Sequence, residues 1–159
     1  MAYRIGSGVD FHQLAEGREV WIGGVKIPHI KGALGHSDAD VLLHAICDAI
    51  LGALALGDIG VHFPDTDNSY ENIDSKILLQ KCIELIDAKG YSVINIDSTL
   101  CLQSPKIKPY VLQMQRLIAS IACIGVDDVS VKATTTEHLG FVGREEGVQA
   151  FATVLLGLK

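Results

Sequence analysis

The segment GHSDADVLLHA, residues 35–45, joins a polar loop to an apolar stretch, and the fold of the chain follows from that junction. Apolar residues recur at helical spacing from Val41 to Leu54, which predicts an amphipathic helix with one face in the core. Ser37 is expected to cap this helix, and Asp40, three positions later, places an acid near its positive end. Two histidines and two aspartates therefore lie within nine residues at the start of a helix.

Extended segments precede this helix in the sequence. The side chains of Tyr3–Asp10 alternate, which predicts a strand that continues to His12. Because side chains repeat every two residues on a strand, Asp10 and His12 would project from one face. Val20–Ile22 and Val25–Ile27 flank Gly23-Gly24, a pair typical of a two-residue turn, and they predict a small hairpin.

The segments that follow the helix continue the alternation of helices and strands. Phe63–Asn68 is rich in turn residues and predicts a loop that is a candidate flap. The tail Gly147–Leu156 fits a short helix or a strand, and we favour a strand because glycine and threonine are poor helix residues. The other predicted elements are a helix Ser75–Lys89 capped by Asp74 and ended by Gly90, a strand Tyr91–Leu102, a helix from Pro109 to Ile124 ended by Gly125, and a strand Val129–Thr135.

These elements predict an α+β fold in one domain, residues 1–159: a mixed four-stranded sheet in βαβαββ-like order, helices on one face, and a small N-terminal hairpin. A composition of 48% hydrophobic and 20% charged residues is ordinary for such a domain. The net charge of −6, without a Lys/Arg cluster, argues against a nucleic-acid surface. No apolar run approaches the ~20 residues of a membrane helix. The four cysteines form no C-x-x-C pair, so reduced thiols in a cytoplasmic protein are expected. The high share of apolar residues suits a homo-oligomer, which would bury apolar surface between subunits.

Asp10, His12 and His44 are the first candidate site. One carboxylate and two imidazoles suit zinc with one coordination position left open. Asp48 lies one helical turn after His44, and we expect it to hold the second ring nitrogen of that histidine. Taken singly, each residue is more simply a hydrogen-bonded histidine or a solvated carboxylate, so it is the combination that favours a metal.

The segment Lys132-Ala133-Thr134-Thr135-Thr136-Glu137 is the second candidate site. Its cation and hydroxyls suit phosphate oxygens, and Glu137 suits a magnesium ion on the same phosphates. The alternative is a threonine-rich strand with a surface glutamate. Arg144 follows closely and fits either a ligand contact or a pair with Glu145 or Glu146.

Six collinear motifs carry a resemblance to a known family. They are Gly8–His12, residues 35–45, Gly57–Gly60, Phe63–Asp67, Pro105-Lys106, and Lys132–Glu137 continued by Gly140-Phe141 and Gly143-Arg144. On these motifs the chain resembles, along essentially its full length, the 2-C-methyl-D-erythritol 2,4-cyclodiphosphate synthase family of the non-mevalonate isoprenoid pathway. The resemblance implies a homotrimer whose sheets face the three-fold axis, with active sites between neighbouring subunits.

The resemblance further implies a phosphorus–oxygen lyase that cyclises its substrate. The 2-phosphate of 4-diphosphocytidyl-2-C-methyl-D-erythritol 2-phosphate would attack the β-phosphate, close a cyclic diphosphate and release CMP. Because this nucleophile is already an anion, the residues need to supply only positioning and charge neutralisation. The rival hypotheses are a different zinc-dependent phosphohydrolase with the same ligands and a non-catalytic trimer that binds an isoprenoid phosphate.

The metals and partners are also implied by the resemblance. Zinc would lie on Asp10, His12 and His44, and a magnesium or manganese ion would lie on Glu137 and the substrate phosphates. An isoprenoid diphosphate at the trimer axis would be a further ligand. Neither nucleic acid nor a membrane is expected as a partner.

The resemblance also implies a role for individual residues in catalysis and in substrate binding. His36 and Thr135 would act at the transition state, whereas Asp38 and Asp40 are expected to cap and support the helix. His62 and His138 are expected to be non-ligands. The substrate-binding residues would be Asp10, His12, His36, Ser37, Asp58, Ile59, Gly60, Phe63, Asp65, Asp67, Leu102, Ser104, Lys106, Lys108, Lys132, Thr134, Thr135, Glu137, Phe141 and Arg144.

Overall fold

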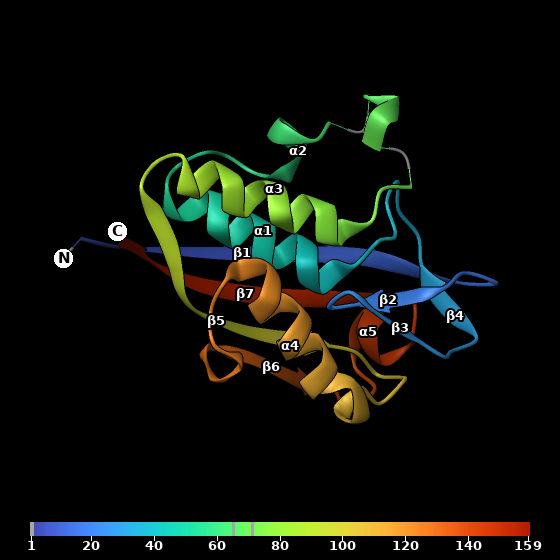
Figure 1. The fold of residues 1–159 in the computed structure, drawn as a ribbon. Coiled ribbons are helices and arrows are strands. Elements are labelled where there is room, and N and C mark those ends of the chain that lie inside the picture. Colours follow the sequence, from blue (N-terminus) through green and yellow to red (C-terminus); the bar gives the residue numbers. More distant parts are fainter. Residues whose placement is uncertain (1, 65, 71) are drawn as a thin grey trace.

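The computed structural model describes residues 2–64, 66–70 and 72–159, and it shows helices layered on a sheet (Figure 1). The strands are β1 (Tyr3–Glu16), β2 (Val20–Ile22), β3 (Val25–Ile27), β4 (Lys31–Ala33), β5 (Tyr91–Cys101), β6 (Val129–Thr134) and β7 (Gly147–Leu158). The helices are α1 (Val41–Ala53), α2 (Ile59–His62), α3 (Ser75–Asp87), α4 (Val111–Ala122) and α5 (Gly140–Gly143), with 3-10 turns at Asn68–Tyr70, Lys108–Tyr110 and Val126–Asp128. The α+β class predicted from the sequence is confirmed.

In the described residues the main sheet has five strands, in the order β4-β1-β7-β5-β6. β5 and β6 are parallel, and the other neighbours are antiparallel. The predicted four-stranded sheet is therefore one strand short. The missing strand, β4, pairs with Leu14–Glu16, the part of β1 that extends past the predicted end at His12. Three residues with a central glycine carry too little alternation to indicate a strand.

The long helices α1, α3 and α4 cover one face of the sheet, as predicted (Figure 1). α1 packs on β1 and β7 beneath it and on α3 beside it, so Leu42, Leu43 and Ile46 are fully buried. The opposite face, which we call the open face, carries exposed apolar side chains: Ile5 is 72% exposed and Phe11 is 51% exposed. The core therefore lies on the covered face of the sheet, where the β2–β3 hairpin contributes Val20, Ile22, Val25 and Ile27 beside the helices.

Two glycines of β1 allow α1 to approach the sheet closely. A Cβ atom at Gly8 would lie 2.0 Å from the carbonyl oxygen of Ala45, and one at Gly6 would lie 1.9 Å from that of Ala49. Any larger residue would push the helix away from the strand. This packing brings the end of β1 next to His44 of α1.

The start of α1 differs from the prediction. Asp40, not Ser37, is the N-cap, and its carboxylate accepts hydrogen bonds from the backbone N–H groups of Leu43, Gly23 and Gly24 at 3.0, 2.9 and 2.6 Å. The helix cannot begin earlier because Ala39 has a φ of +55°. Asp40 thereby ties the β2–β3 hairpin, which forms as predicted, to the first turn of the helix.

The ends of the other helices and strands agree only partly with the prediction. Asp74 caps α3, and the tail forms strand β7. α4 begins at Val111 rather than Pro109, since a 3-10 turn precedes it, and it ends at Cys123, whose φ of +57° is left-handed, before Gly125 is reached. Within the described ranges, every helix is too short or too polar to cross a membrane.

Candidate metal centre and active site

Asp10, His12 and His44 converge at the end of β1. Asp10 and His12 are two residues apart on this strand and are held in register against Ala150 and Val148 of β7. The Asp10 Oδ2 atom lies 3.0 Å from His12 Nε2 and 3.1 Å from His44 Nδ1, and the two ring nitrogens are 3.1 Å apart. The sequence-based prediction that these side chains meet is confirmed.

The three ligand atoms fit a small divalent cation. They all lie within 4.8 Å of one another, the only such group of three in the part of the chain that the structure describes. Ligands at zinc distances of about 2.0–2.1 Å in a tetrahedron are about 3.3 Å apart, so the observed triangle needs to widen only slightly. The donor set of one carboxylate and two imidazoles is also one that zinc accepts.

Electrostatics at this triangle favour a cation. Burial raises the pKa of Asp10, but the hydrogen bonds and charges of His12 and His44 outweigh it and lower the pKa to about 2. Burial lowers the pKa of His44, but the hydrogen bond and charge of Asp10 outweigh it, so the pKa is raised overall. The Asp10 carboxylate thus carries a negative charge that favours positive charge beside it, whether a proton on His44 or a metal ion.

The outer contacts of the histidines only partly follow the prediction. His12 Nδ1 is 2.9 Å from the carbonyl oxygen of Leu34, so the ring donates there and turns Nε2 toward the metal position. Asp48 does not hold His44, because its carboxylate accepts from the Ile59 N–H at 2.8 Å. His44 Nε2 instead lies 2.9 Å from Ser75 Oγ, a contact that sequence reasoning missed.

A cavity of about 380 Å³, which we call the metal cavity, opens beside this triangle. Its lining includes five further predicted site residues: His36, Ser37, Ile59, Gly60 and Phe63. It also includes residues that were not predicted: Gly35, Tyr70, Ile73 and Leu78.

The acids predicted for the same region lie nearby or outside the described chain. Asp58 caps the short helix α2, where it accepts from the Val61 N–H at 3.0 Å, and Asp67 accepts from the Ser69 N–H at 2.9 Å. Asp65 lies outside the described residues. Their contacts with a substrate remain predictions.

A second cavity, of about 630 Å³, lies between the loop after β5 and the end of β6. The predicted residues on its wall are Leu102, Lys106, Lys108, Thr134 and Thr135. Ser104 lines a much smaller neighbouring space. Among the described residues, none lines both the metal cavity and the second cavity, so one chain leaves the two groups of predicted residues apart.

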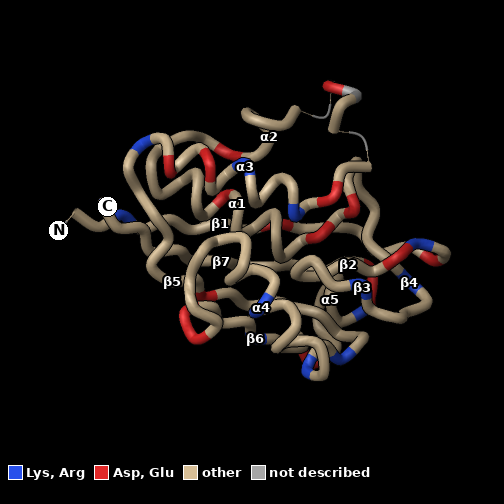
Figure 2. The backbone as a smooth tube through the Cα atoms, viewed as in Figure 1, with Lys and Arg blue, Asp and Glu red and all other residues tan. Residues whose placement is uncertain are grey.

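The remaining predicted residues lie at the edges of these cavities. Lys132 pairs with Asp97 at 2.6 Å on the surface, and Arg144 pairs with Glu146 at 2.9 Å, one of the two alternatives considered for it. Glu137 has a φ of +52° and accepts from Thr135 Oγ1 at 3.1 Å. Phe141 stacks against Phe11 with ring centroids 6.1 Å apart. Figure 2 shows the lysine and arginine positions spread over several elements of the chain.

The fold and this geometry define an α+β domain in which Asp10, His12 and His44, a set that fits a divalent metal ion, lie beside a cavity. Comparison with family models matches residues 3–157 to the YgbB family, and the chain belongs to that family. It is 60% identical over 156 residues to the 2-C-methyl-D-erythritol 2,4-cyclodiphosphate synthase of Bacteroides fragilis (strain YCH46), covering 98% of each chain. The family expected from the six motifs is confirmed.

Solved structures agree with this assignment. The bifunctional IspDF from Campylobacter jejuni matches with a TM-score of 0.95 and 42% identity, over 99% of this chain and 43% of that one. The chain thus spans less than half of that bifunctional protein. A CDP complex of IspF from Plasmodium falciparum matches with a TM-score of 0.87 and 36% identity, over 99% of this chain and 97% of that one.

Proposed function

We propose that the chain converts 4-diphosphocytidyl-2-C-methyl-D-erythritol 2-phosphate to 2-C-methyl-D-erythritol 2,4-cyclodiphosphate and releases CMP. The observation that carries this proposal is the Asp10, His12 and His44 triangle at a cavity, in a chain 60% identical to a named synthase over 98% of its length. The reaction would be part of isoprenoid precursor biosynthesis by the non-mevalonate pathway, in the cytoplasm.

Within this proposal the residues position anions rather than move protons. The 2-phosphate is charged at neutral pH, so its attack on the β-phosphate needs alignment and charge neutralisation. Zinc on the triangle would polarise the β-phosphate, and a magnesium or manganese ion with Glu137 would offset charge on the α- and β-phosphates. Ser37 would bind a phosphate oxygen, and His36 with Thr135 would donate to the charge that grows in the transition state.

The two cavities suit the two ends of this substrate. The metal cavity, with Ile59, Gly60 and Phe63 on its wall, would hold the methylerythritol portion. The second cavity is larger and is lined by apolar side chains together with Lys106 and Lys108, a combination that suits a nucleotide. The CDP complex of the Plasmodium falciparum relative supports a cytidine nucleotide as its ligand.

A homotrimer would join the cavities. No described residue of one chain lines both, so the substrate would have to bridge the metal cavity of one subunit and the second cavity of its neighbour. The open face supports such an assembly because its apolar side chains, including Ile5, Val9 and Phe151, are uncovered in a single chain. Phe141 and Arg144 would lie toward the three-fold axis, where an isoprenoid diphosphate is the proposed further ligand.

Product analysis tests the proposed reaction. The purified protein, first freed of metal by a chelator and then given zinc and magnesium, would be mixed with the cytidine-diphosphate substrate and followed by phosphorus NMR. We expect CMP and a cyclic diphosphate to appear in equal amounts, and only after metal is restored. Inorganic phosphate or a linear product would favour the phosphohydrolase hypothesis, and bound but unchanged substrate would favour the non-catalytic one.

A further inference from the structure

The two ring nitrogens of His44 face different surroundings. Nδ1 faces Asp10 and His12, at 3.1 Å from each ligand atom. Nε2 faces away from the metal position, toward Ser75 Oγ at 2.9 Å. Because a neutral imidazole carries one proton, whichever group accepts from Nε2 decides whether Nδ1 offers a lone pair to the metal.

Ser75 is itself held in one orientation. It is fully buried at the start of α3, and its hydroxyl donates to Asp38 Oδ1. The Ser75 backbone N–H donates to the other oxygen of the same carboxylate at 3.0 Å, and Asp40 N–H adds a third contact at 3.2 Å. Asp38 therefore fixes Ser75 through both its main chain and its side chain.

The direction of the hydrogen bonds from His44 to Ser75 and from Ser75 to Asp38 follows from the Asp38 carboxylate. An ionised carboxylate can only accept, so the Ser75 proton is committed to Asp38. The Ser75 oxygen is then left with lone pairs, and it can only accept from the N–H at His44 Nε2. Nδ1 of His44, whose proton Asp10 otherwise accepts, is then the nitrogen that can release its proton and offer a lone pair to the metal.

We propose that Ser75, anchored by Asp38, is a positioning residue for the metal: it fixes the ring orientation and the tautomer of His44. The inference rests on the zinc binding proposed above. It assigns to Ser75 the task that the sequence had suggested for Asp48, which is occupied by the backbone of α2. Outer hydrogen bonds of this kind typically change metal affinity by about 10- to 100-fold.

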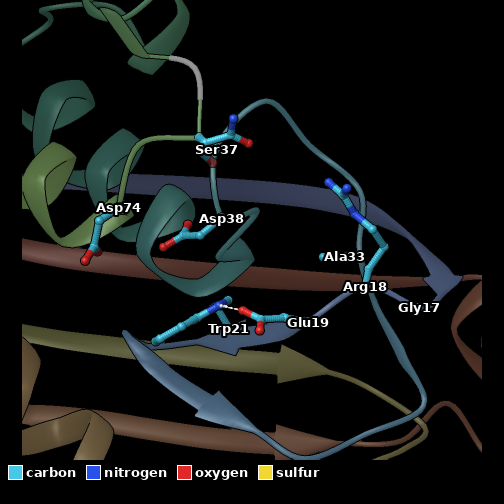
Figure 3. Close-up of a pocket in the computed structure, with 9 residues that line it drawn as sticks. Gly17, Arg18, Glu19, Trp21, Ala33, Ser37, Asp38 and Asp74 are labelled. Carbon is cyan, nitrogen blue, oxygen red and sulfur yellow. Dashed lines mark hydrogen bonds between the residues drawn. The ribbon is translucent and has the colours of Figure 1, made fainter.

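Among the described residues, Asp38 forms no ion pair with a cation. It lies on the wall of a third cavity, of about 420 Å³, together with Arg18, Trp21 and Asp74 (Figure 3). Figure 3 shows the Asp38 carboxylate turned away from the Arg18 guanidinium. Among the described residues, this carboxylate accepts hydrogen bonds from Ser75 and from the Asp40 backbone N–H.

Ser37 is the competing partner for the same nitrogen. Its Oγ lies 3.2 Å from His44 Nε2, farther than Ser75, and the same oxygen accepts from the Ala39 N–H at 3.1 Å. Ser37 also lines the metal cavity, where it is proposed to meet phosphate. Loss of its hydroxyl should therefore raise the KM for substrate more than it weakens zinc.

Zinc affinity of the full-length protein tests the proposal directly. Wild type, Ser75→Ala and Ser98→Ala would each be titrated with zinc against a chromophoric chelator, and the cobalt-substituted forms would be compared by absorption. Ser98 is a matched control because it is also buried and donates one hydrogen bond, to the Ser130 carbonyl at 2.8 Å, away from the metal. Melting of the metal-free variants reports on folding.

We expect Ser75→Ala to weaken zinc by about 10- to 100-fold and to change the cobalt spectrum, while Ser98→Ala stays within about twofold of wild type. Saturating zinc should restore turnover of Ser75→Ala at an unchanged KM. Equal zinc affinity in wild type and Ser75→Ala, or equal losses in both variants, would overturn the positioning role while leaving the proposed reaction intact. A wild type that bound no zinc would overturn the proposed metal site itself.

Discussion

The metal cavity and the second cavity differ in how firmly the chain holds their polar groups. In the metal cavity each histidine of the triangle is fixed by a second contact: the Leu34 carbonyl holds His12, and Ser75 holds His44. In the second cavity Thr134 and Thr135 are exposed, and their hydroxyls bond only to neighbours within the same short segment.

This difference indicates which part of the site a single chain can complete. Metal ligands must be set to within a fraction of an ångström, and β1 and α1 achieve that because they pack together in one subunit. The Thr135 side chain is exposed instead, and its hydrogen bonds among the described residues go to Glu137, two positions away. On the proposed trimer it would gain order from substrate and from the neighbouring subunit.

Removing a ligand from the ordered cavity should have the largest effect. We expect His44→Ala to lose zinc and to lower the cyclisation rate by about 10³-fold or more, since a metal contributes several kcal/mol to charge stabilisation in such transition states. Metal analysis and CMP release would be measured on the same folded sample. His29→Ala, which lies outside the metal cavity, is the control. A folded His44→Ala protein that lacked zinc but kept full turnover would contradict the mechanism.

Mixing chains that carry a substitution in the metal cavity with chains that carry one in the second cavity tests whether each active site lies between two subunits. His44→Ala and Thr135→Ala should each be nearly inactive alone, Thr135→Ala by about 10²-fold because it lacks a transition-state donor. In trimers formed from an equal mixture, about a quarter of the sites would combine an intact metal cavity with an intact second cavity. Co-expressed, differently tagged chains should recover activity to that level. No recovery in a purified mixed trimer would mean that each site belongs to one chain.

Disturbing the close packing of α1 on β1, which positions the residues of the metal cavity, should have the next largest effect. Gly8→Ala would place a Cβ atom 2.0 Å from the Ala45 carbonyl oxygen, so we expect a loss of about 1–3 kcal/mol in the free energy of unfolding and weaker zinc binding. Gly52→Ala is the matched control, because its nearest atom would be 3.8 Å away and alanine favours a helix. Urea denaturation would compare the two. Equal stability would show that the contact between β1 and α1 tolerates a methyl group.

The same contrast explains what the sequence could predict. The meeting of Asp10, His12 and His44 could be predicted because the chemistry of these residues is specific and because Asp10 and His12 share a strand face, a purely local property. The Thr134 to Glu137 segment was recognised by residue type, but its partners lie outside it. Neither a spacing nor a residue type reports which of two cavities a side chain will line.

The errors come from contacts that are distant in the sequence. Ser37 was favoured as the cap of α1 from local chemistry, whereas Asp40 takes that place and also binds the N–H groups of Gly23 and Gly24, seventeen and sixteen positions away. Ser75 looks like an ordinary first residue of a helix, and nothing local indicates a contact with His44. A buried polar side chain at a helix start can therefore contact a residue that is distant in the sequence, as Ser75 contacts His44.

The surface pair beside the second cavity should have the smallest effect. Lys132 Nζ lies 2.6 Å from Asp97 Oδ1, with both side chains about half exposed (54% and 50%), and its hydrogen bond lowers the pKa of Asp97 below the usual 3.8. We expect Asp97→Asn to reduce the free energy of unfolding by less than about 0.5 kcal/mol at pH 7, and by less still in high salt.

The pH dependence of this small difference has a defined sign. Because the pKa of Asp97 is lower in the folded chain, its contribution is fully present above the usual value of 3.8 and is lost as the pH falls through the folded pKa. The gap between wild type and Asp97→Asn should therefore close on acidification, when both are unfolded in urea across a series of pH values. A gap above about 1.5 kcal/mol at pH 7, or one that widens in acid, would mean that the segment leading to the second cavity is held as firmly as the metal ligands are.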